Sequence, residues 1–398
     1  MIESTIQFWR LSLAVLAVSV TLLAGLAGAG DPKSSPYEHR ERHHDQPDAS
    51  ETALVGPEPS FHEQHTADGS KLSKHHPTSD FLRKLDPRME ELGLLLKVDI
   101  AFYDQQASKV IQDGVKNLGT YSWRIYVDWR FLQVKDAGSL FFNFTLLGSF
   151  GLNYTEEQAS WTRNIGSVSE LNGNIYPDES AIDEMFIKYV SPETDYVLGI
   201  GKLDLSNRFD TNAVANDAFR QFFAFALENN LSIPWPDYGG IGAFFRFNFG
   251  EGNYIMVAGA PSIVRHPFEF GNEITNENWY QIAELGLTVD TPFLGEGHYK
   301  LTPWHNRTVN GEGWGVGINF DQALYFKDLI SFFRFGYGEP DATPIEIFVS
   351  AGLTWIKPFG RKNDMFGIGV AWSDSAPTPR TPTQTQDPQS ETLIEIFY

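Results

Sequence analysis

Large apolar residues alternate with polar ones along the chain between Thr120 and Leu152. Up to Phe131 the apolar residues take the odd positions, and after a break at 135–138 they take the even positions from Leu140 onward. A period of two predicts β-strands with one apolar face and one polar face. Each run exceeds the roughly 9–11 tilted residues that a strand needs to cross a bilayer.

The length and chemistry of these strands favour a membrane barrel over a soluble sandwich. Strands of soluble proteins average nearer 5–6 residues, and their wet face is the outer one. A face of Trp, Phe and Ile opposite a face of Arg, Asp and Asn is typical of a strand between lipid and a water-filled lumen. We therefore predict an all-β fold, a transmembrane antiparallel β-barrel.

Similar segments recur from Leu94 to the end of the chain. Short connections at 134–139, 191–195 and 250–252 alternate with long ones at 153–181, 205–239 and 261–278, as in a barrel with tight turns at one end and long loops at the other. The alternation weakens after residue 290, where we expect connections of middling length. The predicted strands are 94–104, 119–132, 140–152, 182–190, 196–204, 240–249, 253–260, 279–289, 298–305, 313–320, 330–338, 346–356, 365–373 and 391–398.

The N-terminal part of the chain predicts an export signal and a polar lead-in. Arg10 precedes an apolar stretch at 11–26, and the small residues at 27–29 are typical of a cleavage site, so we predict a signal peptide at 1–29 rather than an anchor helix. Residues 30–78 lack apolar periodicity, and we expect a disordered lead-in there, followed by a short helix at 79–91 and the barrel domain at 79–398. Seven of the ten histidines lie in this lead-in, and a solvated tail is the interpretation that we favour over metal capture.

Composition excludes several classes of protein. The formal net charge of −21 argues against nucleic acid as a partner, and the absence of cysteine leaves an exported protein without disulfides. The glycines at 311, 313, 315 and 317 lack the spacing of a dinucleotide-binding loop and instead predict room inside the barrel. We expect neither a cofactor nor a bound metal.

One long connection differs from the others. Residues 213–228 carry apolar side chains near helical spacing, and the segment at 233–237 contains two prolines that stiffen the return path. A helix in a barrel loop must pack against something. We predict that the loop at 205–239 lies on the lumen wall and narrows the pore.

Several motifs in sequence order resemble one known family, the carbohydrate-selective porins of the OprB type. The resemblance covers about 94–398, is strongest after 184, and implies a sixteen-stranded outer-membrane barrel through which small sugars diffuse. Porins in general are often trimers, which makes a homotrimer a possible assembly. The motifs are Gly199-Ile200-Gly201-Lys202-Leu203-Asp204, Asn216-Asp217 with Gln221-Phe222, Ile233-Pro234-x-Pro236, Gly239-Gly240-Ile241-Gly242, the segment 297–304, the segment 333–338 and the segment 366–373.

The chain departs from the family pattern in two ways. The His-rich lead-in is unusual, and the chain stops at Tyr398, where the family continues for about two more strands. Either the chain forms a smaller closed barrel of about fourteen strands or it is a truncated product, and we favour truncation. Tyr398, with Ile394 and Ile396 in the same phase, resembles the terminal aromatic signal of barrel assembly.

The polar faces of the predicted strands supply candidate lumen residues. Aromatic rings and fixed polar groups bind sugars weakly enough for release, but the same charged side chains could instead pair across the wall to hold its shape. Trp304 is either a stacking platform or part of a membrane girdle, Trp235 either lines the path or packs within the loop, and Trp123, Trp129, Trp314, Trp355 and Trp372 are expected to face lipid. The candidates are Arg124, Asp128, Arg130, Glu184, Lys188, Lys202, Asp204, Arg246, Glu284, Lys300, Trp304 and Arg334 on the wall, and Asn216, Asp217, Gln221, Trp235 and Asp237 near the constriction.

These observations favour a passive channel for small carbohydrates in the bacterial outer membrane, with sugars and lipid as its partners. A general porin for other small polar solutes and a structural barrel without transport remain as alternatives. An outer-membrane hydrolase would have to use His266, His298 or His305, and the chain lacks a G-x-S-x-G elbow.

Overall fold

The computed structural model describes residues 89, 92–110, 116–152, 165–172, 180–236, 239–250, 252–264, 268, 278–291, 293–308, 311–325, 328–361, 363–375 and 390–398. All of them lie in Glu58–Tyr398, the second of two units into which the chain divides. The predicted signal peptide at 1–29 and the lead-in at 30–78 lie outside the described residues. So does almost all of the predicted helix at 79–91.

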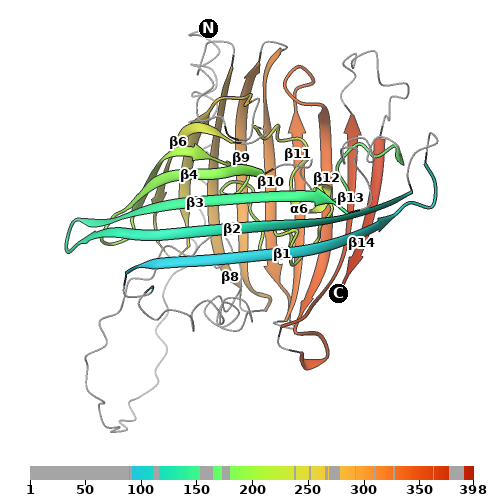
Figure 1. Ribbon diagram of the computed structural model, residues 1–398, viewed down its shortest axis with the longest axis horizontal. Helices are drawn as coiled ribbons and strands as arrows, with labels where there is room; N and C mark the ends of the chain where they lie inside the picture. Colours follow the sequence, from blue (N-terminus) through green and yellow to red (C-terminus); the bar gives the residue numbers. More distant parts are fainter. Residues whose placement is uncertain are drawn as a thin grey trace, which may run out of the picture. The chain divides into compact units, whose positions relative to one another are not determined.

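Fourteen strands form one sheet in which each strand pairs antiparallel with the next along the chain (Figure 1). The all-β prediction is confirmed, and no end of a predicted strand moves by more than three residues. The strands are β1 (Leu94–Gln106), β2 (Asn117–Val134), β3 (Gly138–Gly151), β4 (Ser180–Val190), β5 (Tyr196–Leu203), β6 (Gly240–Asn248), β7 (Tyr254–Ala260), β8 (Trp279–Thr291), β9 (Gly295–Thr308), β10 (Gly311–Ala323), β11 (Leu329–Gly338), β12 (Ile345–Ile356), β13 (Met365–Ser375) and β14 (Ser390–Phe397).

The first two connections after residue 290 are shorter than the middling lengths expected, whereas those at 324–328, 339–344 and 357–364 agree with the expectation. The β8–β9 ladder runs as far as the Thr291–Gly295 pair, and the β9–β10 ladder as far as the Thr308–Gly311 pair. Three and two residues therefore suffice to join these strands. Polar residues at the strand ends, such as Asp290 and Glu296, were excluded from the predicted strands but continue the ladder.

The two faces of the sheet carry opposite chemistry. On the outer face large apolar side chains are exposed, with Ile200 61 % and Phe102 73 % exposed. On the inner face charged side chains are buried, and both Lys202 and Arg334 are 0 % exposed. This inversion of the soluble pattern is typical of a sheet with lipid on its outer side. The predicted outward tryptophans agree with it, since Trp129, Trp314, Trp355 and Trp372 are exposed and Trp123 is half-buried.

A β-bulge changes the alternation in β4. Thr145 of β3 pairs with Glu184 and Leu146 pairs with Ile182, so Asp183 is the extra residue. Because a bulge re-aims a side chain, Asp183 and Glu184 are both buried although they are consecutive. Strict alternation would have placed Asp183 in lipid.

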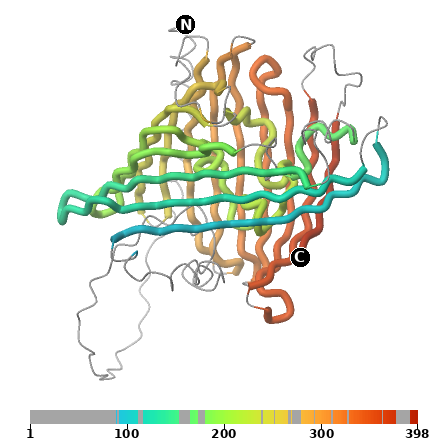
Figure 2. The backbone as a smooth tube through the Cα atoms, viewed as in Figure 1, coloured from blue at the N-terminus to red at the C-terminus, as the bar shows by residue number. Residues whose placement is uncertain are grey.

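The segment between β5 and β6, residues 204–236, lies against the inner face and is called the inner loop. In Figure 2 it is the yellow-green part of the tube beside strands coloured orange, and hydrogen bonds to β9, β10 and β11 fix it there. The predicted helix at 213–228 is wrong in extent. Helix α6 comprises Phe225–Glu228, and residues 204–224 form turns and extended stretches. Among the described residues, no helix is long and apolar enough to cross a lipid bilayer.

Side chains replace the missing helical hydrogen bonds of the inner loop. The side-chain amide oxygen of Gln221 accepts from the backbone N–H groups of Asn216 and Asp217, at 2.7 and 3.1 Å. The Asn216 side chain accepts from the Asn212 N–H, and the Asn212 side chain accepts from the Val214 N–H. Asn and Asp compete with the helix in this way, so apolar spacing alone overestimated the helix.

The inner loop also contacts both end strands of the sheet. The Phe223 ring stacks on Tyr103 of β1 with 6.4 Å between centroids, and Glu395 of β14 accepts from the Phe223 and Ala224 N–H groups at 3.0 Å each. Within the described residues β14 does not pair with β1. The loop thus links the two ends of the sheet from the inner side.

The exposure pattern predicts the effect of a charge on the outer face. Ile200→Arg in the middle of β5 should lower the free energy of unfolding in lipid vesicles by about 2–4 kcal/mol, because the guanidinium would lie in hydrocarbon. Ile200→Leu should change it by less than about 1 kcal/mol. Urea unfolding in vesicles measures both, and equal stability of the two variants would contradict the lipid-facing assignment.

Candidate pore site

Arg334 of β11 fixes the centre of the inner loop. Its guanidinium donates from Nε to the Asp210 carboxylate at 2.9 Å and from Nη1 to the Leu227 carbonyl at 2.9 Å. Nη2 donates to the Ala215 carbonyl at 2.7 Å and, at 3.2 Å, to the Asp210 carbonyl. The side chains of Arg334 and Asp210 are 0 % and 1 % exposed. A fully buried guanidinium therefore donates hydrogen bonds to carbonyls at three separate points of the loop.

Lysines and an asparagine of neighbouring strands make similar contacts. Lys300 of β9 donates to the Thr211 carbonyl at 2.6 Å, and Lys202 of β5 donates to the Gly239 carbonyl at 2.8 Å. Asn319 of β10 donates to the Thr211 carbonyl at 2.9 Å. These wall side chains hydrogen-bond the backbone of the inner loop or, for Lys202, the backbone of Gly239 just after it. They thereby satisfy carbonyls that would otherwise be buried without partners.

Glu284 of β8 is a second buried anchor. Its carboxylate accepts from the Tyr254 hydroxyl at 2.6 Å, the Thr302 hydroxyl at 2.8 Å and the Asp210 N–H at 2.6 Å. Glycines on the inner face of β10 and β11 leave room for the inner loop. A Cβ at Gly336, for example, would collide with the Asn230 and Ser232 side chains. The predicted space beside the glycines of β10 is therefore filled partly by the loop and partly by Trp304, which packs against Gly315.

Four charged side chains form a network where the loop meets β1 and β2. Arg124 lies 3.1 Å from Asp99 and 3.5 Å from Asp217, measured between nitrogen and carboxylate oxygen. Arg220 pairs with Asp99 and lies 2.9 Å from Asp217. Two guanidinium groups and two carboxylates thus balance one another. The Arg124 guanidinium also covers one face of the Phe219 ring, 4.6 Å from its centroid.

A second charged group lies at the end of β5. Arg208 of the loop pairs closely with Glu184 and donates to the Asp204 carbonyl at 3.0 Å. The Asp204 carboxylate accepts from the Ser206 N–H at 2.9 Å and the Ser206 hydroxyl at 2.7 Å. Asp183 accepts from the Asn207 side chain at 3.3 Å. Asp183 and Asp204 therefore have neutral hydrogen-bond partners.

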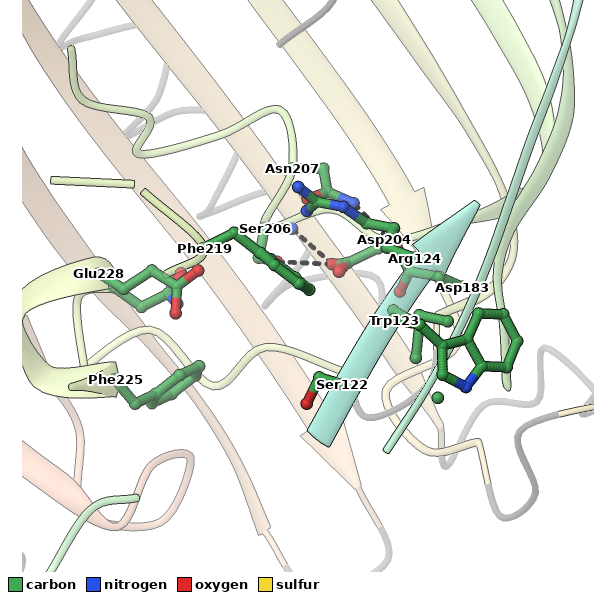
Figure 3. Close-up of a pocket in the computed structure, with 13 residues that line it drawn as sticks. Ser122, Trp123, Arg124, Asp183, Asp204, Ser206, Asn207, Phe219, Phe225 and Glu228 are labelled. Carbon is green, nitrogen blue, oxygen red and sulfur yellow. Dashed lines mark hydrogen bonds between the residues drawn. The ribbon is translucent and has the colours of Figure 1, made fainter. Parts of the chain in front are cut away.

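A small cavity of about 80 Å³ lies between these two charged groups (Figure 3). Its lining includes the carboxyl groups of Asp183, Asp204 and Glu228, the Arg124 guanidinium, and the rings of Phe219 and Phe225. Asn207, Ser206, Asn229 and Ser122 add amide and hydroxyl groups. In Figure 3 the Phe219 ring lies between Glu228 and Asp204. The lining thus combines aromatic surface with groups that donate and accept hydrogen bonds.

The structure distributes the predicted site residues between anchors and the cavity. Arg124 and Asp204 line the cavity. Lys188 lies 3.7 Å from Asp128, as a pair on the wall, and Arg246 covers the Tyr254 ring at 3.9 Å. Asn216, Asp217 and Gln221 organise the loop itself. The anchors described above are Lys202, Glu284, Lys300 and Arg334. Glu184 pairs with Arg208, and Arg130 is half-buried near the end of β2. Asp237 lies outside the described residues.

The two tryptophans of the predicted path are not open platforms. Trp304 lies on the inner face with Lys300, but it is 0 % exposed and packs against Gly315 and Gly338. Trp235 is half-buried and packs against the apolar cluster under the loop. The girdle alternative for Trp304 is therefore wrong, and loop packing describes Trp235.

Sequence reasoning did not single out most of the cavity. Phe219 and Phe225 were counted among the apolar side chains of the predicted helix at 213–228, and Asp183 was not among the candidates. One signal was present, because two consecutive acids at Asp183 and Glu184 inside a membrane strand require a bulge or a defect in the alternation.

Burial changes the ionisation of two loop carboxyls. Burial, and to a smaller extent the nearby Asp217, raise the pKa of Glu228 to about 8. Burial also raises the pKa of Asp210 to about 6, although the Arg334 guanidinium opposes this shift. Glu228 is therefore mostly protonated near neutral pH and can both donate and accept a hydrogen bond. Within the described part of the chain, no three His, Cys, Asp or Glu side chains are placed to hold a metal ion.

The antiparallel sheet with apolar outer face and charged inner face is a porin fold. A structure described as the high-pH form of Pseudomonas putida OprB superposes on it with a TM-score of 0.58 at 13 % identity, covering 73 % of this chain and 77 % of that chain. A low-pH structure of the same protein gives a TM-score of 0.43 at 14 % identity over 75 % of this chain and 82 % of that one. The first likeness supports the fold alone.

Residues 305–398 match the family model described as carbohydrate-selective porin, OprB family. The resemblance found in the sequence is thereby confirmed over a segment that runs from His305 in β9 to the end of β14. No curated protein matches the chain.

Removing the central anchor should release the inner loop. Arg334→Ala would leave Asp210 buried without its cation and should lower the free energy of unfolding by about 3–5 kcal/mol. Arg361→Ala serves as the control, because this guanidinium is 65 % exposed and its pair with Asp364 contributes about 1 kcal/mol at most. Limited proteolysis in vesicles should cut the Arg334 variant within 204–236 first, and an intact loop in that variant would contradict the anchoring role.

Glu228 predicts a loss of stability at alkaline pH. With a pKa of about 8 in the fold and 4.5 unfolded, the favourable contribution of its neutral form is complete below about pH 4.5 and is lost as pH rises through 8. The loss should be on the order of 3–5 kcal/mol. Glu228→Gln should remove this pH dependence while preserving stability at pH 5 within about 1 kcal/mol. Urea unfolding of both proteins at pH 5 and again above pH 8 measures this loss of stability. If the wild-type protein and Glu228→Gln lose stability in parallel as pH rises, Glu228 is not the group responsible.

Proposed function

We propose that this chain is a passive channel through which small carbohydrates diffuse across the bacterial outer membrane, and that the inner loop narrows its lumen. The observation that carries the proposal is the chemistry of the cavity between the loop and strands β2–β4. Phe219 and Phe225 offer ring faces to the weakly apolar face of a sugar. Carboxyl, amide and hydroxyl groups around them bond its hydroxyls.

The position of the cavity suits a permeation path. It lies on the inner face, beside a loop whose backbone is fixed by Arg334 and Lys300, so its dimensions are set by buried contacts. Neutral polar groups and balanced ion pairs supply many weak contacts, and a permeating solute must be able to leave as well as enter. We take the inner loop, residues 204–236, as the constriction.

The porin fold and the family match indicate a channel rather than an enzyme. The described histidines fit this view. His298 has Asp321 at 2.6 Å from Nδ1 and Glu296 at 3.5 Å from Nε2, so carboxylates face both ring nitrogens. His305 faces Glu312 at 3.2 Å. His266, the third candidate for a hydrolase, lies outside the described residues.

Three further elements belong to this proposal. Export by a signal peptide at 1–29 would bring the protein to the outer membrane, where the apolar outer face meets lipid. The sugars bind weakly and transiently in passage. A homotrimer would be the assembly, and cross-linking of the protein in native membranes tests it.

Replacing the central ring of the cavity should weaken sugar binding. In planar bilayers, the glucose or maltose concentration that halves the single-channel current should rise about 3- to 10-fold in Phe219→Ala, because one stacking surface is lost. Phe245→Ala is the matched control, since this ring is 44 % exposed on the outer face of β6. A wild-type current that neither sugar changes would refute the carbohydrate channel and favour a general porin.

A further inference from the structure

The lining of the cavity holds more carboxyl groups than cations, and this concerns which sugars it accepts. The Arg124 guanidinium is the one cation in its described lining, and Asp99 and Asp217 already surround it at 3.1 and 3.5 Å. Arg208, just outside the lining, pairs with Glu184. Because carboxylates already pair with these guanidinium groups, a solute in the cavity meets little net positive potential from them.

Two carboxylates remain beside the empty space. Asp183 accepts from an amide at 3.3 Å, and Asp204 accepts from the Ser206 N–H and hydroxyl at 2.9 and 2.7 Å. Both line the cavity, and Asp183 is only 9 % exposed. Figure 3 shows the two side chains near one another on the side opposite Glu228. Burial raises the pKa of Asp204, although the nearby Arg208 and Lys202 oppose this shift. A protonated amine held between Asp183 and Asp204 would favour the ionised form of both carboxyls, so the pair prefers a cation to a neutral group.

The aromatic rings strengthen this preference. Phe219 already accepts one guanidinium over its face, at 4.6 Å, which shows that its environment suits cation–π contact. Phe225 borders the same space. A hydroxylated ring that carries an ammonium group would bond the amides through its hydroxyls, contact the phenyl rings, and place its charge near the two carboxylates.

We propose that the cavity is a subsite for sugars that carry a protonated amine, which it binds in preference to neutral sugars and to sugar acids. The inference rests on the proposed function, because it names the substrate class of the same path. Asp183 and Asp204 determine the charge preference, and Phe219, Phe225 and Asn207 hold the sugar body. A sugar acid would meet the same carboxylates as like charges and be disfavoured.

Current block in planar bilayers near neutral pH tests the inference. Glucosamine should halve the single-channel current of the wild-type protein at a concentration about 5- to 10-fold lower than glucose, whereas the neutral N-acetylglucosamine should match glucose. The double variant Asp183→Asn with Asp204→Asn should lower the glucosamine preference to about one. Its single-channel conductance in the absence of sugar should match that of the wild-type protein, which shows that the variant still inserts as a folded channel. Asp136→Asn, in the exposed β2–β3 turn, is the matched control and should keep the full preference.

The outcomes separate the two proposals. Equal block by glucosamine and glucose in the wild-type protein overturns the amine subsite and leaves the carbohydrate channel standing. A glucosamine preference that persists in the double variant also overturns it, because the charge would then lie elsewhere. If neither glucose nor N-acetylglucosamine alters the current of any variant, the carbohydrate channel itself fails.

Discussion

The buried ion pair between Arg334 and Asp210 is the contact on which the rest of the inner structure depends. A guanidinium that is 0 % exposed must satisfy its donors within the protein, and here it does so with one carboxylate and with carbonyls from three points of the loop. Lys300, Lys202 and Glu284 extend the same principle to the flanking loop residues. The loop is irregular in shape because wall side chains, rather than helical bonds, satisfy its backbone.

A fixed loop gives the inner face a defined polar cavity. The balanced network of Asp99, Arg124, Asp217 and Arg220 closes one side, and Asp183, Asp204 and Arg208 form the other. Aromatic rings from the loop lie between them. The charged wall therefore has two roles, since most of its members position the loop and a few border the path.

Strand positions could be predicted from sequence because alternation is a local signal enforced by lipid on one side and water on the other. Placement of Lys300 and Arg334 on the inner face followed from the same rule. The rule failed at Asp183, where a bulge adds one residue, and at 213–224, where Asn212, Asn216 and Gln221 bond the backbone. Which inner residues anchor and which border the cavity depends on contacts between strands distant in sequence, and no local pattern encodes that.

The central claim, that solutes pass through the cavity beside Phe219, is tested most directly by blocking it chemically. The chain contains no cysteine, so Phe219→Cys introduces a single thiol at the cavity lining. Addition of a bulky water-soluble thiol reagent during single-channel recording should lower the conductance by at least about half in this variant and leave the wild-type protein unaffected. Complete modification of the thiol, verified by mass spectrometry, with unchanged conductance would show that solutes pass elsewhere.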